Sequence, residues 1–491
     1  MLTPLAAAPL AVILVAMGVF RASAALAGAL GLSVALVLGI SLFDLSQNPL
    51  PLVAGAGAEA GYTTLSILWI IFPALALYEF QNRSGAIADI RDALGAMTTD
   101  RRLQAVLIAW FFGLFIEGAA GFGTPVALGA PLLVGLGYSP VRAVVLALVG
   151  HAAGVCFGAV GTPTITQVEL SGLDPLVLAG TAASFQATLG SILLLATMYL
   201  AGDGPLTRSD LKWAALAAPL FFVPSLLLAW FVGPELPSLG GALIGASVFI
   251  AIVLRSQKTA QTPDMKKIFP DLLPYLLIVG LVLITRLVGP LKEALVAVNF
   301  GWSWQDGQFA GKFQPLYHPG TLLMLGLVAA ALITRRTGYL APSFKAALKT
   351  LGSVALALVA MLALSRVMVH SGMIGTLAEA AAGMGAGWPL AAPALGVLGT
   401  FITGSATASN ILFTELQLTT AQTLGLAPAT MVAAQGFGAA IGNIICPHNI
   451  IAGSATVGLV GREGDILRKT FWIGLGYTGL GGLLVFGLGA F

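Results

Sequence analysis

The sequence is poor in charged residues. Only 9% of its 491 residues are Asp, Glu, Lys or Arg, whereas 58% are hydrophobic. An ordinary soluble domain is about 25% charged. A soluble protein must still wet its surface, so this scarcity excludes a soluble fold and predicts an integral membrane protein. The net charge of +3 comes from cations in loops, which gives no reason to expect a nucleic-acid partner.

Cysteines and catalytic motifs are scarce as well. The two cysteines, Cys156 and Cys446, lie in apolar stretches, so we expect no disulfide framework, metal site or cofactor. The predicted spans contain no H-E-x-x-H, G-x-S-x-G or paired-aspartate motif, and the chain has no nucleotide loop. This argues against an enzyme and against a primary pump. No basic region precedes the first apolar run, so we expect no cleaved signal peptide.

Long apolar runs, by contrast, are abundant. A full bilayer crossing needs about 20 apolar residues, and full spans are predicted near 3–20, 22–43, 61–80, 142–160, 176–201, 213–232, 238–254, 272–289, 320–334, 351–370 and 471–490. The clearest cationic loops hold Arg83, Arg91, Arg101 and Arg102, then Arg255, Lys258, Lys266 and Lys267, then Arg335, Arg336, Lys345 and Lys349. The positive-inside rule assigns these loops to the cytoplasm and segment 290–319 to the outside.

The chain contains a weak internal repeat. Ser84-Gly85 recurs as Ser371-Gly372, an offset of 287 residues, and "GLFIEG" at 113–118 recurs as "GTFITG" at 399–404, an offset of 286. Further collinear matches pair Pro140, Gly150 and Gly154 with Pro428, Gly438 and Gly442. The two copies enter the membrane from opposite sides of the predicted topology. This predicts two repeats of inverted topology.

Each copy also contains an apolar stretch that is too short to cross. Segments 103–117 and 389–403 have 15 residues each, about 22 Å of helix against about 30 Å of hydrocarbon. A glycine-rich or hydroxyl-rich turn and a second short arm follow each one. We therefore predict two re-entrant helical hairpins, at about 103–136 and 389–422, with their tips near the midplane. Broken crossing helices follow at about 142–165 and 429–449, where Pro163 and Pro447 remove a backbone donor.

These elements predict an all-α polytopic membrane protein built as an elevator-type secondary transporter. We divide the chain into N-terminal scaffold helices (1–54), a first repeat (55–204), connecting scaffold helices (205–340) and a second repeat (341–491). Irregular backbone inside a membrane is tolerated where it lines a cavity. The tips and breaks are therefore the expected place for a substrate.

Three titratable residues are candidates for coupling transport to a proton. Glu117 stands alone at the end of the first hairpin arm, and intramembrane acids usually serve function. The alternative is an acid that holds the tip in shape by accepting hydrogen bonds from backbone amides. His151 and His448 are candidates for a proton relay, with ordinary packing as their alternative.

A small monocarboxylate would need hydrogen-bond donors at the tips. Backbone N–H groups and the positive ends of helices supply them, and glycines permit close approach. The substrate-binding candidates are Gly121, Gly123, Thr124, Thr162, Thr403, Ser405, Thr407, Ser409, Asn410, Gln435 and Asn443, each with packing or capping as its alternative. Arg366 is the best-placed buried cation. It contacts either the substrate or Glu117, or extends toward the outer surface.

The stretches "EGAAGFGTPVA", "GTFITGSATASNILF" and "GNIICPHNI" resemble the L-lactate permease family. This is a family of bacterial symporters of lactate or glycolate with a proton. The resemblance covers most of the chain and is densest in the two repeats. It implies a bacterial plasma (inner) membrane location, an elevator-type movement and a homodimer. Two positions depart from the family pattern: Ala406, where a polar residue is usual, and Ala408, where serine is frequent.

The leading hypothesis is therefore a proton-coupled importer of small 2-hydroxy monocarboxylates, with L-lactate first and D-lactate or glycolate next. A sodium-coupled carboxylate symporter is the alternative, because hydroxyl groups and freed carbonyls also suit Na⁺. A channel or a membrane enzyme fits the paired hairpins less well.

Overall fold

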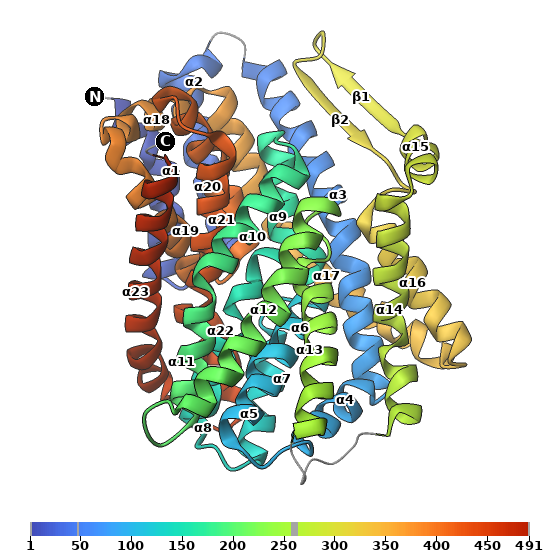
Figure 1. Cartoon of the computed structure of the whole chain (residues 1–491). Helices are drawn as coiled ribbons and strands as arrows, with labels where there is room; N and C mark the ends of the chain where they lie inside the picture. Colours follow the sequence, from blue (N-terminus) through green and yellow to red (C-terminus); the bar gives the residue numbers. More distant parts are fainter. Residues whose placement is uncertain (1, 47–48, 257–263, 490–491) are drawn as a thin grey trace.

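The computed structural model describes residues 2–46, 49–256 and 264–489, which form a tall bundle of helices with one β-hairpin (Figure 1). Within these residues ten helices are long and apolar enough to cross a membrane, or twelve if each of two bent helix pairs forms one span. The predicted helical membrane class is confirmed. Three parts of the predictions lie outside the described residues: residues 1 and 47–48 of the N-terminal domain, Lys258, and the end of the last span and domain at 490–491.

Most helices follow the predicted apolar runs. The arms predicted at 103–117 and 389–403 belong to the 19-residue helical stretches Arg101–Ala119 and Gly385–Thr403, which are long enough to cross, whereas the spans predicted at 3–20 and 320–334 form the shorter helices Leu2–Gly18 and Pro319–Ile333. In chain order the helices are α1 Leu2–Gly18, α2 Ala24–Leu42, α3 Pro49–Arg83, α4 Ala86–Gly95, α5 Arg101–Ala105, the π-helical η2 Val106–Phe112, α6 Gly113–Ala119, α7 Thr124–Gly135, α8 Pro140–His151, the 3₁₀ segment η3 Ala152–Phe157, α9 Gly158–Ser171, α10 Pro175–Leu189, α11 Ser191–Ala201, α12 Arg208–Phe231, α13 Pro237–Ser256, α14 Met265–Leu287, α15 Gly289–Ala297, α16 Pro319–Ile333, α17 Leu340–His370, α18 Met373–Ala382, α19 Trp388–Thr403, α20 Ala406–Leu424, α21 Pro428–Ile445, α22 Pro447–Thr456 and α23 Glu463–Gly489. Short 3₁₀ turns η1 Asp44–Ser46, η4 Thr337–Tyr339 and η5 Gly385–Gly387 complete the list.

Burial separates a central group of helices from a peripheral one. The most apolar windows of Arg101–Ala119 and Pro140–Ser171 are 94% and 100% buried, whereas those of α12 and α23 are only 33% and 28% buried. Apolar side chains on the peripheral helices therefore face outward, as expected for helices in contact with lipid. The central elements are those that contain the predicted first hairpin and its crossing helix.

Helix α3 begins at Pro49, twelve residues before the predicted start of its span at 61. A β-hairpin packs against the extra turns: a Cβ at Gly55 would lie 2.4 Å from the Phe309 ring, so only glycine fits there. Figure 1 shows the hairpin beside the first turns of α3. The added length thus comes from a tertiary contact that hydropathy does not record.

The β-hairpin lies in the segment predicted to be outside, and it adds a small sheet to the helical fold. Strands β1 Phe300–Trp304 and β2 Phe309–Phe313 pair antiparallel, with Phe300 opposite Phe313. The connecting turn has positive φ at Gln305, Asp306 and Gly307. The sequence does contain the signal, since aromatic residues alternate on both sides of an Asp-Gly pair.

Candidate functional site

The first predicted hairpin turns between α6 and α7. Three consecutive residues at the turn, Gly121, Phe122 and Gly123, have φ of 59°, 52° and 78°. Glycine adopts such angles freely, whereas a bulky residue like Phe122 does so at a cost in free energy. The Thr124 hydroxyl donates to Gly121 O at 2.6 Å and closes the turn.

The second predicted hairpin turns between α19 and α20 in a different way. Gly404 is left-handed, with φ of 76°, and Ser405 caps α20 by accepting from Ala408 N at 3.3 Å. Within the described chain the next two N–H groups, those of Ala406 and Thr407, donate to no protein acceptor. Free N–H groups at a helix start favour an anion.

The first crossing helix breaks where α8 gives way to η3 and then α9. Ala159, Val160 and Gly161 all have positive φ, of 44°, 54° and 81°. A left-handed conformation costs an L-residue about 1–2 kcal/mol, and such strain tends to cluster at functional sites. The Thr162 hydroxyl donates to Ala159 O at 2.6 Å, which satisfies one carbonyl at the break.

The second crossing helix breaks between α21 and α22, which are bent by 40°. Pro447 begins the second part, as prolines often do at the first position of a helix. The Asn449 amide donates to the side-chain oxygen of Asn443 across the break. This contact joins the two parts of the broken crossing helix.

The two turns and the two breaks line one cavity of about 350 Å³. Helices α3 and α17 supply a facing wall, with Ile71, Leu358 and Met361 among its residues. A second cavity, of about 950 Å³, shares Ala24, Thr403, Gly404 and His448 with the first. Four segments that are far apart in sequence thus converge on a space suited to a small molecule.

Glu117 lines this cavity and is only 4% exposed. Its Oε2 lies 4.0 Å from His151 Nε2, which is too far for a direct hydrogen bond. Among the described residues no lysine or arginine pairs with it. His151 Nδ1 lies 2.6 Å from Ala147 O and donates to it in the neutral ring. A buried acid beside a neutral imidazole can hold a proton without leaving a charge.

Gly158 is the residue that makes room for this acid. A Cβ at Gly158 would lie 2.1 Å from Glu117 Oε1, closer than any side chain allows. The neighbouring Gly118 of α6 packs closely against α13, because a Cβ there would lie 2.3 Å from Leu239 N. The Glu117 carboxylate therefore occupies a narrow slot against Gly158, at the first break.

The predicted site residues divide into two groups. The cavity lining includes Glu117, Gly121, Gly123, Thr162, Thr403, Ser405, Thr407, Asn443 and His448. The lining does not include Thr124, His151, Ser409, Asn410, Gln435 or Arg366. Their roles, inside or outside the lining, stay predictions.

Several residues of the second group form a polar network behind the second turn. The Ser409 hydroxyl donates to Gly396 O at 2.9 Å, and Gln435 Nε2 donates to Ser409 Oγ at 3.1 Å. Asn410 Nδ2 donates to Pro163 O at 3.1 Å and ties α20 to the first crossing helix. Buried and hydrogen-bonded in this way, the network holds the turn in place.

Arg366 lies near the C-terminal end of α17. Its Nη1 donates to Glu415 Oε1 at 3.0 Å, so its carboxylate partner is Glu415 rather than Glu117. The side chain is 13% exposed. The described structure thus places this cation in an ion pair next to the site.

Three further residues belong to the cavity or its wall. Phe122 and Asn449 line it, and Gly158 shapes the slot for Glu117. Phe122 is part of the glycine-rich stretch "EGAAGFGTPVA", but phenylalanine as a residue type does not predict a positive φ. Asn449 lies two residues after Pro447, where a broken helix needs a polar partner, and this place is the signal that the sequence offers for it.

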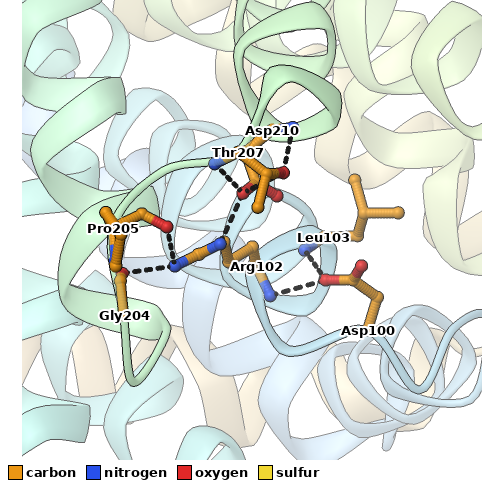
Figure 2. A network of polar contacts seen from close by, with 7 residues as sticks. All are labelled: Asp100, Arg102, Leu103, Gly204, Pro205, Thr207 and Asp210. Atoms are coloured by element: carbon orange, nitrogen blue, oxygen red, sulfur yellow. Dashed lines mark hydrogen bonds and ion pairs between the residues drawn. The ribbon is translucent and has the colours of Figure 1, made fainter.

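The start of the first hairpin is anchored by a polar network at the predicted cytoplasmic end, drawn in Figure 2. Asp100 caps α5 by accepting from Arg102 N and Leu103 N. The Arg102 guanidinium pairs with Asp210 on α12 and donates to Gly204 O at 2.6 Å. The helix that carries Glu117 is therefore fixed at its base.

An exposed ion pair lies at the same end of the molecule. Arg142 on α8 donates to Oδ1 of Asp203, in the connection between α11 and α12, at 2.7 Å. This hydrogen bond holds the pKa of the Asp203 carboxyl below its usual range. Because Asp203 is fully exposed, solvent screens the pair and it adds little stability.

Comparisons with known proteins agree with one another. The sequence model of a family described as L-lactate permease matches residues 3–305 and 305–488. A glycolate permease of Escherichia coli (strain K12) is 32% identical and is matched over 94% of this chain and 91% of its own length. An L-lactate permease of Streptococcus iniae is 33% identical, over 87% and 93%, and one of Bacillus subtilis (strain 168) is 30% identical, over 93% and 90%.

Among solved structures, the Alcanivorax borkumensis YdaH transporter superposes with a TM-score of 0.50, covering 90% of this chain and 88% of that one. The two sequences are only 16% identical. This likeness therefore concerns the fold alone.

Proposed function

The chain belongs to the L-lactate permease family, and from this premise we propose that it imports small 2-hydroxy monocarboxylates in symport with a proton. L-Lactate is the first candidate substrate, with D-lactate and glycolate next. The family and the apolar helices make it a multi-pass protein of the bacterial inner membrane. Permeases are transporters rather than enzymes.

One observation carries the proposal: a single cavity joins both turns and both breaks, and one buried acid lines it. The cavity offers donors that suit a carboxylate. The N–H groups of Ala406 and Thr407 have no acceptor within the described chain, and they lie at the positive end of α20. The hydroxyls of Thr403 and Ser405 lie beside them.

The proton has a clear energetic purpose. A lactate anion that enters a cell with a negative interior is opposed by about 2.3 kcal/mol per 100 mV. A proton that moves with it cancels the charge and uses the pH gradient. We assign that proton to Glu117, with His151 and His448 as relay partners. Neutral Glu117 would remove a repulsive charge from the cavity and so favour binding of the anion.

We also propose that the two halves are inverted repeats. The elements correspond in order: α4 and α18 both follow a left-handed glycine, Gly85 at φ 82° and Gly372 at φ 78°. A turn and then a broken crossing helix follow in each half. In an elevator movement these turns and crossings would carry the substrate past α3 and α17. The proposed divisions at 54/55, 204/205 and 340/341, and the homodimer, belong to the same proposal.

Sodium coupling is the second candidate, and one observation favours it. Asn410 Oδ1 is buried without a hydrogen-bond donor among the described residues, close to the first break. An oxygen without a donor can coordinate a cation, and the hydroxyl oxygens of the second turn are its neighbours in sequence.

Uptake by the purified protein in proteoliposomes distinguishes proton coupling from sodium coupling. We expect labelled L-lactate to accumulate when the outside is acidic and not when only a sodium gradient is imposed. Uptake driven by sodium and indifferent to the pH gradient would overturn proton coupling. Competition by unlabelled D-lactate, glycolate and acetate then ranks the substrates, and an acid without a 2-hydroxyl that competes as well as lactate would overturn the 2-hydroxy preference.

A further inference from the structure

A buried charged cluster connects the two sides of the cavity. Arg366 on α17 pairs with Glu415 on α20 at 3.0 Å, and its Nε lies 3.9 Å from Glu59 Oε2 on α3. His370, one turn beyond Arg366, places Nε2 2.9 Å from the same Glu59 oxygen. The four side chains are between 9% and 16% exposed. Arg366 also donates to the backbone of Glu169 on α9 at 3.5 Å.

The cluster lies beyond one end of the cavity. Met361, on the cavity wall, precedes Arg366 on α17 by about 7.5 Å of helix, and Ala408 precedes Glu415 on α20 by about 10 Å. The same helix α17 begins close to Arg335, Arg336, Lys345 and Lys349, which the positive-inside rule assigns to the cytoplasm. The cluster therefore occupies the outer end.

An apolar layer shares these helices with the charges. Ile67 of α3, Leu170 of α9, Leu362 of α17 and Ile411 of α20 belong to one buried cluster, together with the wall residues Leu358 and Met361. In sequence, Leu362 precedes Arg366 and Ile411 precedes Glu415 by one turn each. The layer thus joins α3 and α17 to α9 and α20 between the cavity and the ion pairs.

The other end of the cavity leads into a wider space. The second cavity, which shares Thr403, Gly404 and His448 with the first, is also lined by Glu463 and Gly464 at the start of α23. The cations Arg462 and Arg468 flank these residues in sequence, which places this end on the cytoplasmic side. The site thus continues into the second cavity on the cytoplasmic side, whereas the apolar layer and the ion pairs lie on its outer side.

We propose that Arg366 and Glu415 are positioning residues of an outer gate: their ion pair holds α20 against α17 over the apolar layer, and it separates each time the site opens outward. This inference rests on the proposed transport through the cavity. Removing one partner from a buried ion pair normally leaves an uncompensated charge. Glu59 lies on α3, which packs against α17. When Glu415 moves away, the Glu59 carboxylate therefore still compensates the charge of the Arg366 guanidinium.

Labelling of a cavity cysteine tests the gate without any substrate. Phe122→Cys places a thiol at a cavity residue that is 42% exposed, while native Cys156 and Cys446 are buried. A membrane-impermeant maleimide is applied to intact cells, where it reaches the outer face of the protein, or to the medium around inverted vesicles, where it reaches the cytoplasmic face. We expect Glu415→Gln and Arg366→Gln, each in the Phe122→Cys background, to raise labelling from outside several-fold and not to raise it from inside.

Two further variants separate gating from general loosening. Glu379→Gln, at an exposed acid on α18, should leave labelling at the level of Phe122→Cys alone. The charge exchange Arg366→Glu with Glu415→Arg should lower outside labelling again, because it rebuilds the pair in reverse.

Unchanged outside labelling in Glu415→Gln overturns the gate, and so does an equal rise from both sides. If Arg366→Gln fails to reach the membrane, labelling of Glu415→Gln alone tests the gate, because glutamine has nearly the same size as the glutamate that it replaces. Labelling also tells the two proposals apart. A chain that transports no lactate yet shows the outside rise keeps the gate and loses the proposed function.

Discussion

The two turns that meet in the cavity have the same backbone task and different chemistry. The first turn uses three consecutive left-handed residues, Gly121 to Gly123, and follows the buried acid Glu117. The second uses one left-handed glycine, Gly404, and a serine cap that leaves two N–H groups without an acceptor in the described chain. In the predicted topology both turns interrupt a helix inside the membrane, where free polar groups persist only beside a cavity.

Under the proposed function, this difference divides two chemical roles, proton binding and carboxylate binding, between the halves of the chain. An acid that gains and loses a proton is best kept in an apolar slot, away from strong donors that would fix it as an anion. A carboxylate substrate needs such donors, and the second turn provides them. Repeated architecture therefore need not repeat its chemistry. The three changes below test this division.

Glu117→Gln should have the largest effect. The amide keeps the size of the side chain but cannot release a proton, so uptake driven by a pH gradient should fall at least about 100-fold, equivalent to about 2.7 kcal/mol. Exchange of internal for external lactate, which needs no net proton movement, should continue. If uptake driven by the pH gradient is unchanged, Glu117 is a structural residue, and the assignment of proton coupling to the first half is wrong.

The matched control is Glu379→Gln, the same substitution at an exposed acid of the second half. It should leave both driven uptake and exchange unchanged.

Gly158→Ala should have an intermediate effect, because its methyl group would lie 2.1 Å from Glu117 Oε1 and force the acid out of its slot. We expect driven uptake to fall about 10-fold, equivalent to about 1.4 kcal/mol, with lactate affinity less affected. The fall is measured as the rate of lactate uptake under a fixed pH gradient. Gly61→Ala, at a helical glycine with open space around it, is the control. A loss of affinity with normal coupling would place Gly158 in substrate binding instead.

Ala406→Ser should have the smallest effect and concerns the second turn alone. The added hydroxyl restores polarity beside the free N–H groups, so the ratio of glycolate to lactate uptake should change about 2- to 5-fold, equivalent to about 0.4–1 kcal/mol. Dependence on the pH gradient should stay the same. The ratio is measured by competition, with Ala29→Ser on the exposed face of α2 as control. A change in coupling without a change in ratio would contradict the division.

Much of the fold could be predicted from sequence because the membrane imposes lengths. The spans and short arms follow hydropathy, and the breaks follow glycine and proline. Misplaced boundaries have identifiable causes. Helix α3 gains its first turns from contact between Gly55 and Phe309, and α10 bends by 42° into α11 at Gly190, where a Cβ would lie 2.2 Å from the Phe222 ring. Neither contact can be derived from local pattern.

For the site, the sequence indicated which segments to inspect but not which atoms face the cavity. Glu117 and Asn443 are rare polar residues in apolar runs, so they stood out. Ser409 and Gln435 looked equally suitable, yet the structure places them in a network behind the turn. Side-chain direction depends on how α20 and α21 pack, and Arg366 found a partner 49 residues away. Such pairings require three-dimensional knowledge.

The close approach of Gly158 to Glu117 has a consequence for evolution. The two positions lie on different helices, but they share one volume, so they form a single heritable unit. A side chain at position 158 would displace the Glu117 carboxylate, so a lineage that acquires one is expected to change position 117 as well. Among divergent descendants of this chain, the pair should therefore change together or remain fixed together.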